Sequence, residues 1–280
     1  MDSHTGDTAG GGSEEPEAYY LPRGNRRYEP TRATESPWDR TAQHGGPPAA
    51  LLAHVIDQTV EGPLRIGRIS VDMLGPIPLR EAVVEVSVIK PGRRVHLTEA
   101  RMIVDGRVVV TARAWHIATG DRPPITGDEE TVPPTVPPRP ATQPFYPGLD
   151  DWGYGRSVEW RFTHGGFDSL GAADVWARVR LPLVDGVALT GQDRALILAD
   201  SANGLSLSLP LDQWFSIPPT TTATLLRPPA GEWVHLACRT YLADDGVGLA
   251  HAGLFDPDGP IGEVAQPLLM QKRKPANGAS

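Results

Sequence analysis

Two segments in opposite halves of the chain carry the same pattern, and this repetition constrains the fold more than any other feature. Residues 94–117, "RVHLTEARMIVDGRVVVTARAWHI", and residues 247–270, "VGLAHAGLFDPDGPIGEVAQPLLM", each alternate apolar and polar residues on both sides of an Asp-Gly pair. Alternation with a period of two is typical of β-strands, and an Asp-Gly pair between two such runs favours a tight turn. The sequence therefore predicts one β-hairpin in each half.

The spacing between matching positions is nearly constant along the chain. The two Asp-Gly pairs are 258 − 105 = 153 positions apart, and the same offset aligns Gln266 with Arg113. Upstream, the apolar runs "VDMLGP" (71–76) and "ATLLRP" (223–228) match at 228 − 76 = 152. A shared offset is better evidence for duplication than shared composition, so we interpret the chain as two copies of one structural unit.

Each copy also contains a segment with the apolar spacing of a helix. In residues 44–60, "HGGPPAALLAHVIDQTV", proline suits the first helical turn because its missing N–H needs no partner there. In residues 193–204, "DRALILADSANG", we expect a helix that stops at Gly204. A curved antiparallel sheet around a buried helix satisfies both patterns. The predicted fold class is α+β, with the two sheets joined edge to edge into one wall.

Segments rich in glycine, proline and charge separate these units. Proline cannot donate a hydrogen bond within a sheet, so the proline-dense stretch in the middle of the chain is interpreted as a linker that lies over a surface. The expected organisation is a disordered N-terminal tail (1–17), a first unit (18–120), the linker (121–147), a second unit (148–271) and a C-terminal tail (272–280).

Composition argues against several classes of partner. The formal net charge is −8 and the most basic run is a short "KRK" near the C-terminus, so we expect no nucleic-acid binding. No run of about 18 apolar residues is present to span a membrane, and the N-terminus lacks the pattern of a signal peptide. The single cysteine, Cys238, rules out an internal disulfide. We therefore expect a cytoplasmic protein with no membrane span.

Several motifs, in this order, resemble those of the acyl-CoA thioesterase II family and its actinobacterial relatives, in which two hotdog units follow each other in one chain. The residues that carry the resemblance include "HGGPPAALLAHVID" (44–57), "LADSANG" (198–204), "TTTATLLRPPAGEWVHL" (220–236) and "EVAQPL" (263–268). The resemblance spans about residues 20–271. It implies a double hotdog, in which each unit has a long helix wrapped by an antiparallel sheet.

The resemblance also implies an activity: hydrolysis of the thioester of a fatty acyl-CoA by direct attack of water, without a cofactor or metal. In that family an Asp on a helix, a hydroxyl residue on a strand and a Gln on the last strand hold the water. Asp200 and Gln266 match the first and third of these residues. The family's threonine position falls on Pro218, which has no hydroxyl, so Thr220 on the same face is the expected substitute. The implied catalytic residues are Asp200, Thr220 and Gln266, and the implied partner is an acyl-CoA substrate.

Each of these residues also has a purely structural interpretation. Asp200 can be a solvated residue near a helix end, and Thr220 begins a threonine-rich strand that β propensity explains. Gln266 lies on the apolar side of its strand, where an amide without partners costs about 1–3 kcal/mol, and neighbouring backbone is its commonest partner. The repeat aligns Gln266 with Arg113, so the fold requires no amide there. We therefore expect a single site in the second unit, with Gln266 within one bridging water of Asp200.

Two other functions stay open. A non-catalytic acyl-CoA-binding protein is consistent with Pro218 at the family's threonine position. An enoyl-CoA hydratase of this fold would need a histidine shortly after Asn203, and none follows. The "HGG" motifs at His44 and His164 are 164 − 44 = 120 residues apart, which does not fit the repeat. We therefore discount them as a catalytic signature, although their backbone N–H groups can bind an oxyanion.

The remaining histidines and the quaternary structure are less informative. His54, His96 and His251 show no metal-ligand spacing and are interpreted as core or surface residues. A double unit already contains the pairing that single units obtain by dimerising. Both a monomer and, through exposed sheet edges, a homodimer are therefore compatible with the sequence.

Overall fold

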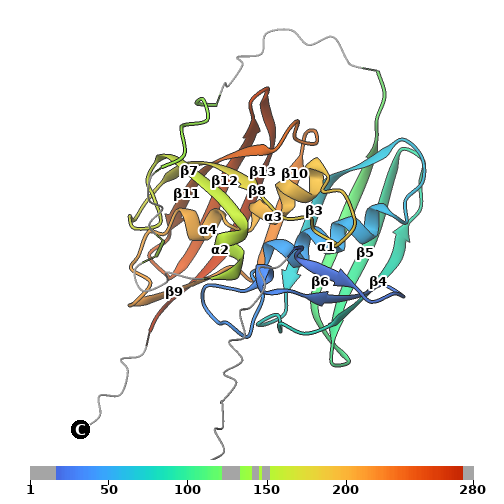
Figure 1. Ribbon diagram of the computed structural model, residues 1–280, viewed down its shortest axis with the longest axis horizontal. Helices are drawn as coiled ribbons and strands as arrows, with labels where there is room; N and C mark the ends of the chain where they lie inside the picture. The colour runs from blue at the N-terminus through green and yellow to red at the C-terminus, as the bar shows by residue number, and fades with distance from the viewer. Residues whose placement is uncertain (1–16, 122–132, 141–144, 147–151, 274–280) are drawn as a thin grey trace, which may run out of the picture.

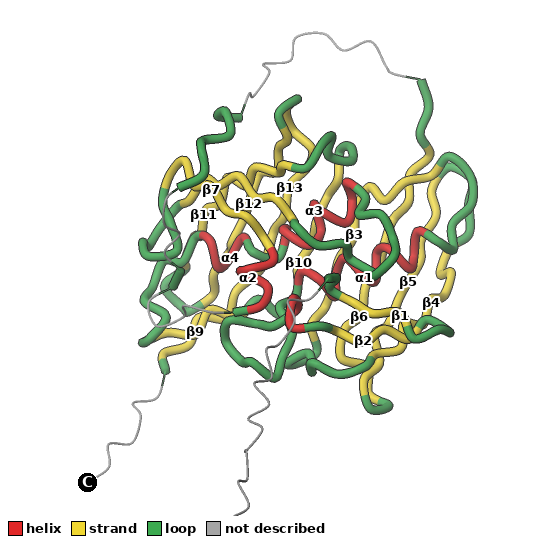
Figure 2. The backbone as a smooth tube through the Cα atoms, in the orientation of Figure 1, coloured by secondary structure: helices red, strands yellow, loops and turns green. Residues whose placement is uncertain are grey.

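The computed structural model describes residues 17–121, 133–140, 145–146 and 152–273. In these ranges the strands form one sheet of thirteen strands, in which all neighbouring strands are antiparallel (Figures 1 and 2). The strands are β1 (Tyr20–Pro22), β2 (Arg27–Pro30), β3 (Leu64–Met73), β4 (Ala82–Lys90), β5 (Val95–Val104), β6 (Arg107–Ala118), β7 (Val158–His164), β8 (Ala173–Val179), β9 (Trp214–Ile217), β10 (Thr220–Leu225), β11 (Trp233–Leu242), β12 (Val247–Asp256) and β13 (Gly259–Lys272).

The order of strands across the sheet reads almost the same from both ends. It is β1-β2-β4-β5-β6-β3-β10-β13-β12-β11-β8-β7, with β9 paired to β13 beside this path. The series β4-β5-β6-β3 therefore mirrors β11-β12-β13-β10, and the two series meet where β3 pairs with β10. Pairing β3 with β10 covers one edge of the sheet in each half, so each half keeps one fewer unpaired edge strand. The expected single wall is confirmed.

The helices are short and few. They are the 3₁₀ turn η1 (Arg32–Thr34), α1 (Gly46–Asp57), α2 (Gly153–Ser157), α3 (Gly191–Ala199) and α4 (Ala202–Leu205). α1 has 12 residues and α3 has 9, so neither is the long helix that we expected. The second helix also does not continue to Gly204: it ends at Ala199, and Gly204 lies within the separate turn α4.

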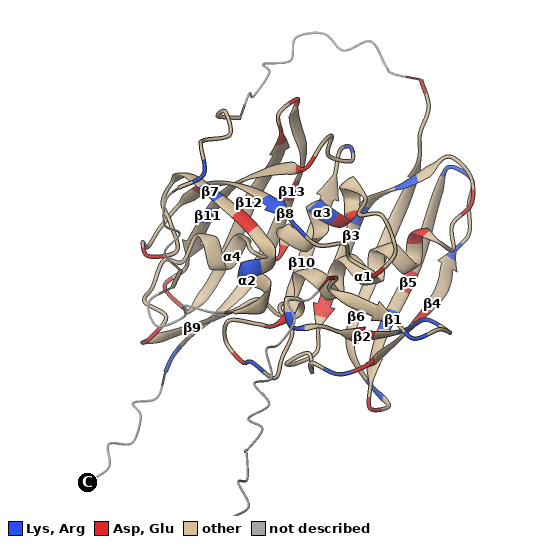
Figure 3. Ribbon diagram, in the orientation of Figure 1, with Lys and Arg blue, Asp and Glu red and all other residues tan. Residues whose placement is uncertain are grey.

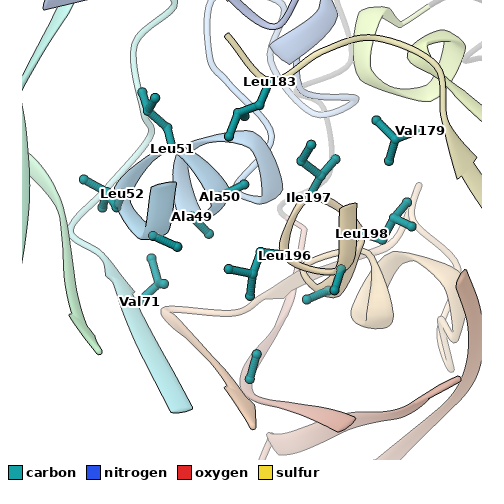
Figure 4. Close-up of a cluster of buried hydrophobic side chains, with 14 of the residues drawn as sticks. Ala49, Ala50, Leu51, Leu52, Val71, Val179, Leu183, Leu196, Ile197 and Leu198 are labelled. Atoms are coloured by element: carbon teal, nitrogen blue, oxygen red, sulfur yellow. The ribbon is translucent and has the colours of Figure 1, made fainter. Parts of the chain in front are cut away.

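α1 and α3 run antiparallel and pack against each other in the middle of the molecule (Figure 1). A Cβ atom on Gly46, at the start of α1, would lie 2.1 Å from the carbonyl oxygen of Ile197 near the end of α3, so only glycine allows this approach. Buried apolar side chains fill the space around the two helices (Figure 4). Those labelled on the helices are Ala49, Ala50, Leu51, Leu52, Leu196, Ile197 and Leu198.

The two predicted hairpins are present, but one turn is shifted by a residue. In the first, Val104 pairs with Arg107 around Asp105 and Gly106, both with positive φ. In the second, the pairing of Asp256 with Gly259 places the turn one residue before the Asp-Gly pair. The hairpin pairs therefore correspond at an offset of 256 − 104 = 152 and 259 − 107 = 152, in place of 153.

This offset corrects the alignment of Gln266. Its counterpart at 266 − 152 = 114 is Ala114, which is buried, and not Arg113. Arg113 points to the other side of its strand, where it donates a hydrogen bond to Glu99. The conclusion that the fold requires no amide at this position is unchanged, because alanine occupies it in the first unit.

The described part of the linker lies against the second half of the sheet. The indole N–H of Trp176 on β8 donates to the carbonyl of Pro134, and Arg161 on β7 donates to the carbonyl of Pro137. The rest of the linker lies outside the described residues, as do the predicted tails apart from residue 17 and residues 272–273. The predicted domain boundaries stay predictions.

Charged residues form no single-sign surface among the described helices and strands. Acidic and basic residues are interspersed over them (Figure 3). None of the described helices has the length and apolar character needed to cross a membrane.

Candidate active site

Three side chains from different elements form a closed hydrogen-bonded group in the second half of the molecule. The hydroxyl of Thr221 donates to Oδ1 of Asp200 at 2.9 Å. Nε2 of Gln266 donates to the same Oδ1 at 2.9 Å and to Oγ1 of Thr221 at 2.9 Å. Gln266 is fully buried and Thr221 is nearly so. We call these three residues the polar triad.

Local structure explains why the triad residues meet. Asp200 is the residue at which α3 ends, and its backbone no longer continues the helix into α4. Gln266 faces inward on β13 because Val264 and Leu268, two residues away on either side, are buried in the core. Thr221 on β10 lies one residue beyond the Thr222–Ala265 pair, which puts it opposite Gln266. A helix end and two neighbouring strands therefore hold the group.

A fourth contact fixes the orientation of the Gln266 amide. The backbone N–H of Asn203, in α4, donates to Oε1 of Gln266 at 3.0 Å. With the oxygen held there, Nε2 must face Asp200 and Thr221, and both of its hydrogens have acceptors. Gln266 therefore contacts Asp200 directly, closer than the one bridging water that we expected.

The structure does not bring Thr220 to Asp200. The hydroxyl of Thr220 donates to the carbonyl of Val71 on the neighbouring strand β3, at 2.9 Å. β10 begins at Thr220, and alternation along the strand sends residue 221 inward and residue 220 to the other side. The expected hydroxyl is thus present, but it belongs to Thr221. The face expected for Thr220 was counted from Pro218, which precedes the strand, whereas the inward face of β10 begins with Thr221.

The second oxygen of Asp200 has a different environment. Oδ1 accepts hydrogen bonds from both triad partners, whereas Oδ2 accepts none from the residues that the structure describes. Oδ2 lies 3.6 Å from Nδ1 of His44, and a Cβ atom on Gly45 would be 2.6 Å from it. The carboxylate is therefore held by one oxygen and offers the other toward the start of α1.

His44 is a site residue that the sequence analysis noted and discounted. Its ring stacks on Tyr154 with 3.9 Å between centroids and 5° between planes. Burial lowers the pKa of His44, and the nearby Asp200 carboxylate only partly opposes this. Nδ1 accepts a hydrogen bond from the N–H of Gly46, which assigns the ring proton to Nε2. A neutral imidazole therefore lies beside Asp200.

The start of α1 supplies an electrostatic feature that α3 lacks. The N-cap of α1 is Gly45 and makes no side-chain cap, whereas Thr190 and Asp193 cap the start of α3 reciprocally. The Gly46 N–H is already bonded to His44 Nδ1, and Pro47 and Pro48 have no N–H. This helix start therefore attracts negative charge mainly through its dipole, which no acidic side chain in the first turn offsets. This helix start and Asp200 Oδ2 face each other. Together they provide a proton acceptor and a site that favours an oxyanion.

Tyr154 contacts both the end of α3, next to Asp200, and His44, before α1. Its hydroxyl donates to the carbonyl of Ile197 in α3 at 2.9 Å and lies 2.7 Å from Oγ of Ser201, the residue after Asp200. Its ring simultaneously supports His44. Among the described residues no group of three or more His, Cys, Asp and Glu side chains converges as metal ligands do. Water activation is the chemistry that the side chains present are suited to perform.

Comparisons with known proteins identify the family of the chain. A family model described as the acyl-CoA thioesterase C-terminal domain matches residues 130–270, and a model described as the N-terminal domain matches residues 34–117. No curated protein sequence matches the chain significantly.

Solved structures share the fold at low sequence identity. A hotdog-fold protein of unknown function from Alicyclobacillus acidocaldarius has a TM-score of 0.69 and 19% identity, covering 93% of this chain and 98% of its own. A putative thioesterase II from Thermobifida fusca has a TM-score of 0.66 and 17% identity, with coverages of 92% and 98%. An acyl-CoA thioesterase II from Mycobacterium marinum has a TM-score of 0.63 and 16% identity, with coverages of 91% and 94%. The chain therefore has the hotdog fold, belongs to the acyl-CoA thioesterase family and is a thioester hydrolase.

Proposed function

We propose that the protein hydrolyses the thioester of a fatty acyl-CoA by direct attack of a water molecule that Asp200 activates. Thr221 takes the place that we expected for Thr220, and Gln266 keeps its expected place. The observation that carries the proposal is that the two Asp200 oxygens have different hydrogen-bond partners. Oδ1 is held by Thr221 and Gln266, and Oδ2 is left for a water molecule. The finer architecture that we propose is two tandem hotdog units joined through β3 and β10.

The reaction follows from this geometry. Water hydrogen-bonded to Oδ2 attacks the thioester carbon, and as the new C–O bond forms its proton passes to Oδ2. Negative charge develops on the carbonyl oxygen, where the positive end of the α1 dipole stabilises it. The tetrahedral intermediate then collapses with cleavage of the C–S bond. The proton on Asp200 returns to the departing thiolate, so the products are a carboxylic acid and free CoA.

Thr221 and Gln266 act by orienting Asp200. A carboxylate that accepts two hydrogen bonds on one oxygen cannot rotate without losing both, so its other oxygen keeps a fixed direction. A base held in one orientation keeps the attacking water close to the thioester carbon. The effective molarity of that water depends strongly on how well the base is held. Asn203 helps to orient Asp200 indirectly, because its backbone N–H donates to Oε1 of Gln266 and so holds the Gln266 amide in place.

The decisive experiment measures release of free thiol from acyl-CoA substrates of several chain lengths. The Asp200→Asn variant should lose at least about 100-fold in kcat/KM, which is the scale of losing a general base. Asp244→Asn is the matched control, because it changes an exposed carboxylate in the same way, in the turn between β11 and β12 and outside the polar triad. Hydrolysis by Asp200→Asn at the wild-type rate would overturn the mechanism.

Two further outcomes separate the alternative functions. Tight acyl-CoA binding by calorimetry without thiol release at any chain length would identify a non-catalytic binder. Loss of enoyl absorbance from an enoyl-CoA without thiol release would identify a hydratase. The second alternative gains one observation, since His44 provides a histidine beside Asp200 that the sequence after Asn203 does not.

A further inference from the structure

The first unit contains polar groups at the position that corresponds to the polar triad. In the second unit Gln266 pairs across the strands with Ala250, and at the offset of 152 the corresponding pair in the first unit is Ala114 with Thr98. Each unit thus has one polar residue in this buried pair, but on the opposite strand. The position has not become wholly apolar in the first unit.

An aspartate also ends the helix of the first unit. Asp57 is the last residue of α1, and Oδ1 of Asp57 lies 3.1 Å from Nε2 of His116 on β6. Oδ2 of Asp57 accepts a hydrogen bond from Nε2 of Gln192, in the first turn of α3, at 3.0 Å. Because α1 and α3 are antiparallel, Asp57 faces the start of α3 much as Asp200 faces the start of α1.

Three buried polar atoms near this aspartate lack partners among the described residues: Nδ1 of His116, Nε2 of His96 and Oγ1 of Thr98. His116 and Thr98 are fully buried. His96 pairs with His116 across the strands, their rings 6.1 Å apart and edge-on, and Thr98 is two residues from His96 on the same face. An unpaired buried polar atom costs about 1–3 kcal/mol. Three of them together on one face indicate a site that takes a polar group from outside.

We propose that His116, His96 and Thr98 bind the thioester group of a second acyl thioester in the first unit. The ligand class rests on the proposed function, because the same helix-and-sheet environment is repeated here. Asp57 accepts the N–H of His116 at Nε2, which leaves Nδ1 as an acceptor for water. The hydroxyl of Thr98 and the N–H of His96 are then the donors available to a carbonyl oxygen.

This second site binds without hydrolysing. Both carboxylate oxygens of Asp57 have partners, Oδ1 with His116 and Oδ2 with Gln192, so neither is left to activate a water as Oδ2 of Asp200 is. The start of α3 also already carries the carboxylate of Asp193 in its capping box, which disfavours an oxyanion there. Asp57 links the fully buried His116 to the surface, since the Asp57 side chain is 42% exposed. The ligand of this site would approach past Asp57, at the end of α1.

The number of ligands bound per chain tests the proposal. The probe is a set of S-(2-oxoalkyl)-CoA analogues of short, medium and long chain, which keep a carbonyl near sulfur but have no thioester bond to cleave. Calorimetry on wild type should give two molecules per chain. The His116→Leu and Thr98→Ala variants should give one, since each introduces the residue found at the corresponding position of the second unit, Leu268 and Ala250.

The outcomes distinguish this proposal from the proposed function. One molecule per chain on a wild type that releases thiol, or two on both variants, would overturn the second site alone. No binding to wild type and no thiol release would overturn both. Asp200→Asn should keep the molecule bound in the first unit, because the contacts of Asp200 are with Thr221, Gln266 and His44 and not with the residues of this second site. Thermal melting of each variant checks folding, and Thr98→Ala carries the test if His116→Leu does not fold.

Discussion

The hydroxyl oxygens of Ser70 and Thr222 lie 2.9 Å apart at the centre of the sheet, where β3 pairs with β10. The two residues are separated by 222 − 70 = 152 positions, the same offset that relates the two hairpins. A residue that faces its own counterpart marks a two-fold relation between the units. The approximate two-fold axis therefore passes between Ser70 and Thr222.

Side chains at corresponding positions explain why the described part of the first unit has no copy of the polar triad. At the offset of 152, Thr221 corresponds to Ile69 and Gln266 to Ala114, and Ile69 pairs with Ala114 across the strands of the first unit. Both are buried apolar residues that cannot hold a carboxylate. The two units therefore have the same strand pairing at this position, and only the side chains differ.

Replacing Gln266 by alanine should lower kcat more than it changes KM. The substitution removes one of the two donors on Asp200 Oδ1 and leaves the N–H of Asn203 without its acceptor. We expect a fall in kcat of about 10- to 100-fold, as for loss of a group that orients a base. Gln271→Ala on the exposed part of the same strand is the control. A rise in KM alone would show that Gln266 binds substrate and does not orient Asp200.

The two adjacent threonines give a direct test of the site geometry. Thr221→Val keeps the shape of the side chain but removes the hydroxyl that donates to Asp200, so kcat should fall at least about tenfold. Thr220→Val removes a hydrogen bond to the carbonyl of Val71, which should cost about 0.5–1.5 kcal/mol of unfolding free energy. Thiol release and urea unfolding on both variants separate the two effects. A larger loss of activity in Thr220→Val would restore the original assignment.

The sequence predicted the strands and the repeat because these depend on local patterns, and the resemblance to the thioesterase II family implied two of the triad residues. Alternation located both hairpins, and the position of Asp200 after an apolar helix placed it near the core. Thr221 was missed because a misalignment of one residue assigns a side chain to the opposite face of a strand. Counting back to Pro218 gave no indication that β10 begins at Thr220. The same error of one residue aligned Gln266 with Arg113.

The part of the site that the sequence did not predict depends on contacts between residues far apart in the chain. His44 is 156 positions from Asp200 (200 − 44 = 156), and only the antiparallel packing of α1 on α3 brings them together. Spacing along the chain carries no sign of this contact. The glycine pair after His44 was the available signal, because glycine at a helix start is needed where another backbone approaches closely.

Alanine substitutions at Gly45 and Gly46 should have different consequences. At Gly46 the new Cβ atom would meet the backbone carbonyl of Ile197 at 2.1 Å, which cannot move cheaply, so we expect a loss of about 2–4 kcal/mol in unfolding free energy. At Gly45 it would meet side-chain atoms, Oδ2 of Asp200 at 2.6 Å and Sδ of Met73 at 2.8 Å. Gly45→Ala should therefore fold but lose activity. Equal destabilisation of both variants, with activity kept in Gly45→Ala, would argue against Oδ2 as the base.

His44 should make the protein less stable as the pH falls. Burial lowers the pKa of His44 below its ordinary value of 6.5, so between pH 6.5 and that lower value the unfolded chain binds more protons than the folded one. The contribution of His44 to stability is therefore complete above about pH 7 and declines as the pH falls through this window.

The His44→Phe variant isolates this contribution, because phenylalanine can keep the stacking on Tyr154 and does not titrate. The difference in unfolding free energy between wild type and His44→Phe should shift in favour of the variant from pH 7 to pH 5. Denaturant unfolding at several pH values measures it. A shift in the opposite direction would mean that Asp200 raises the pKa of His44 more than burial lowers it, and that the imidazole beside Asp200 is charged.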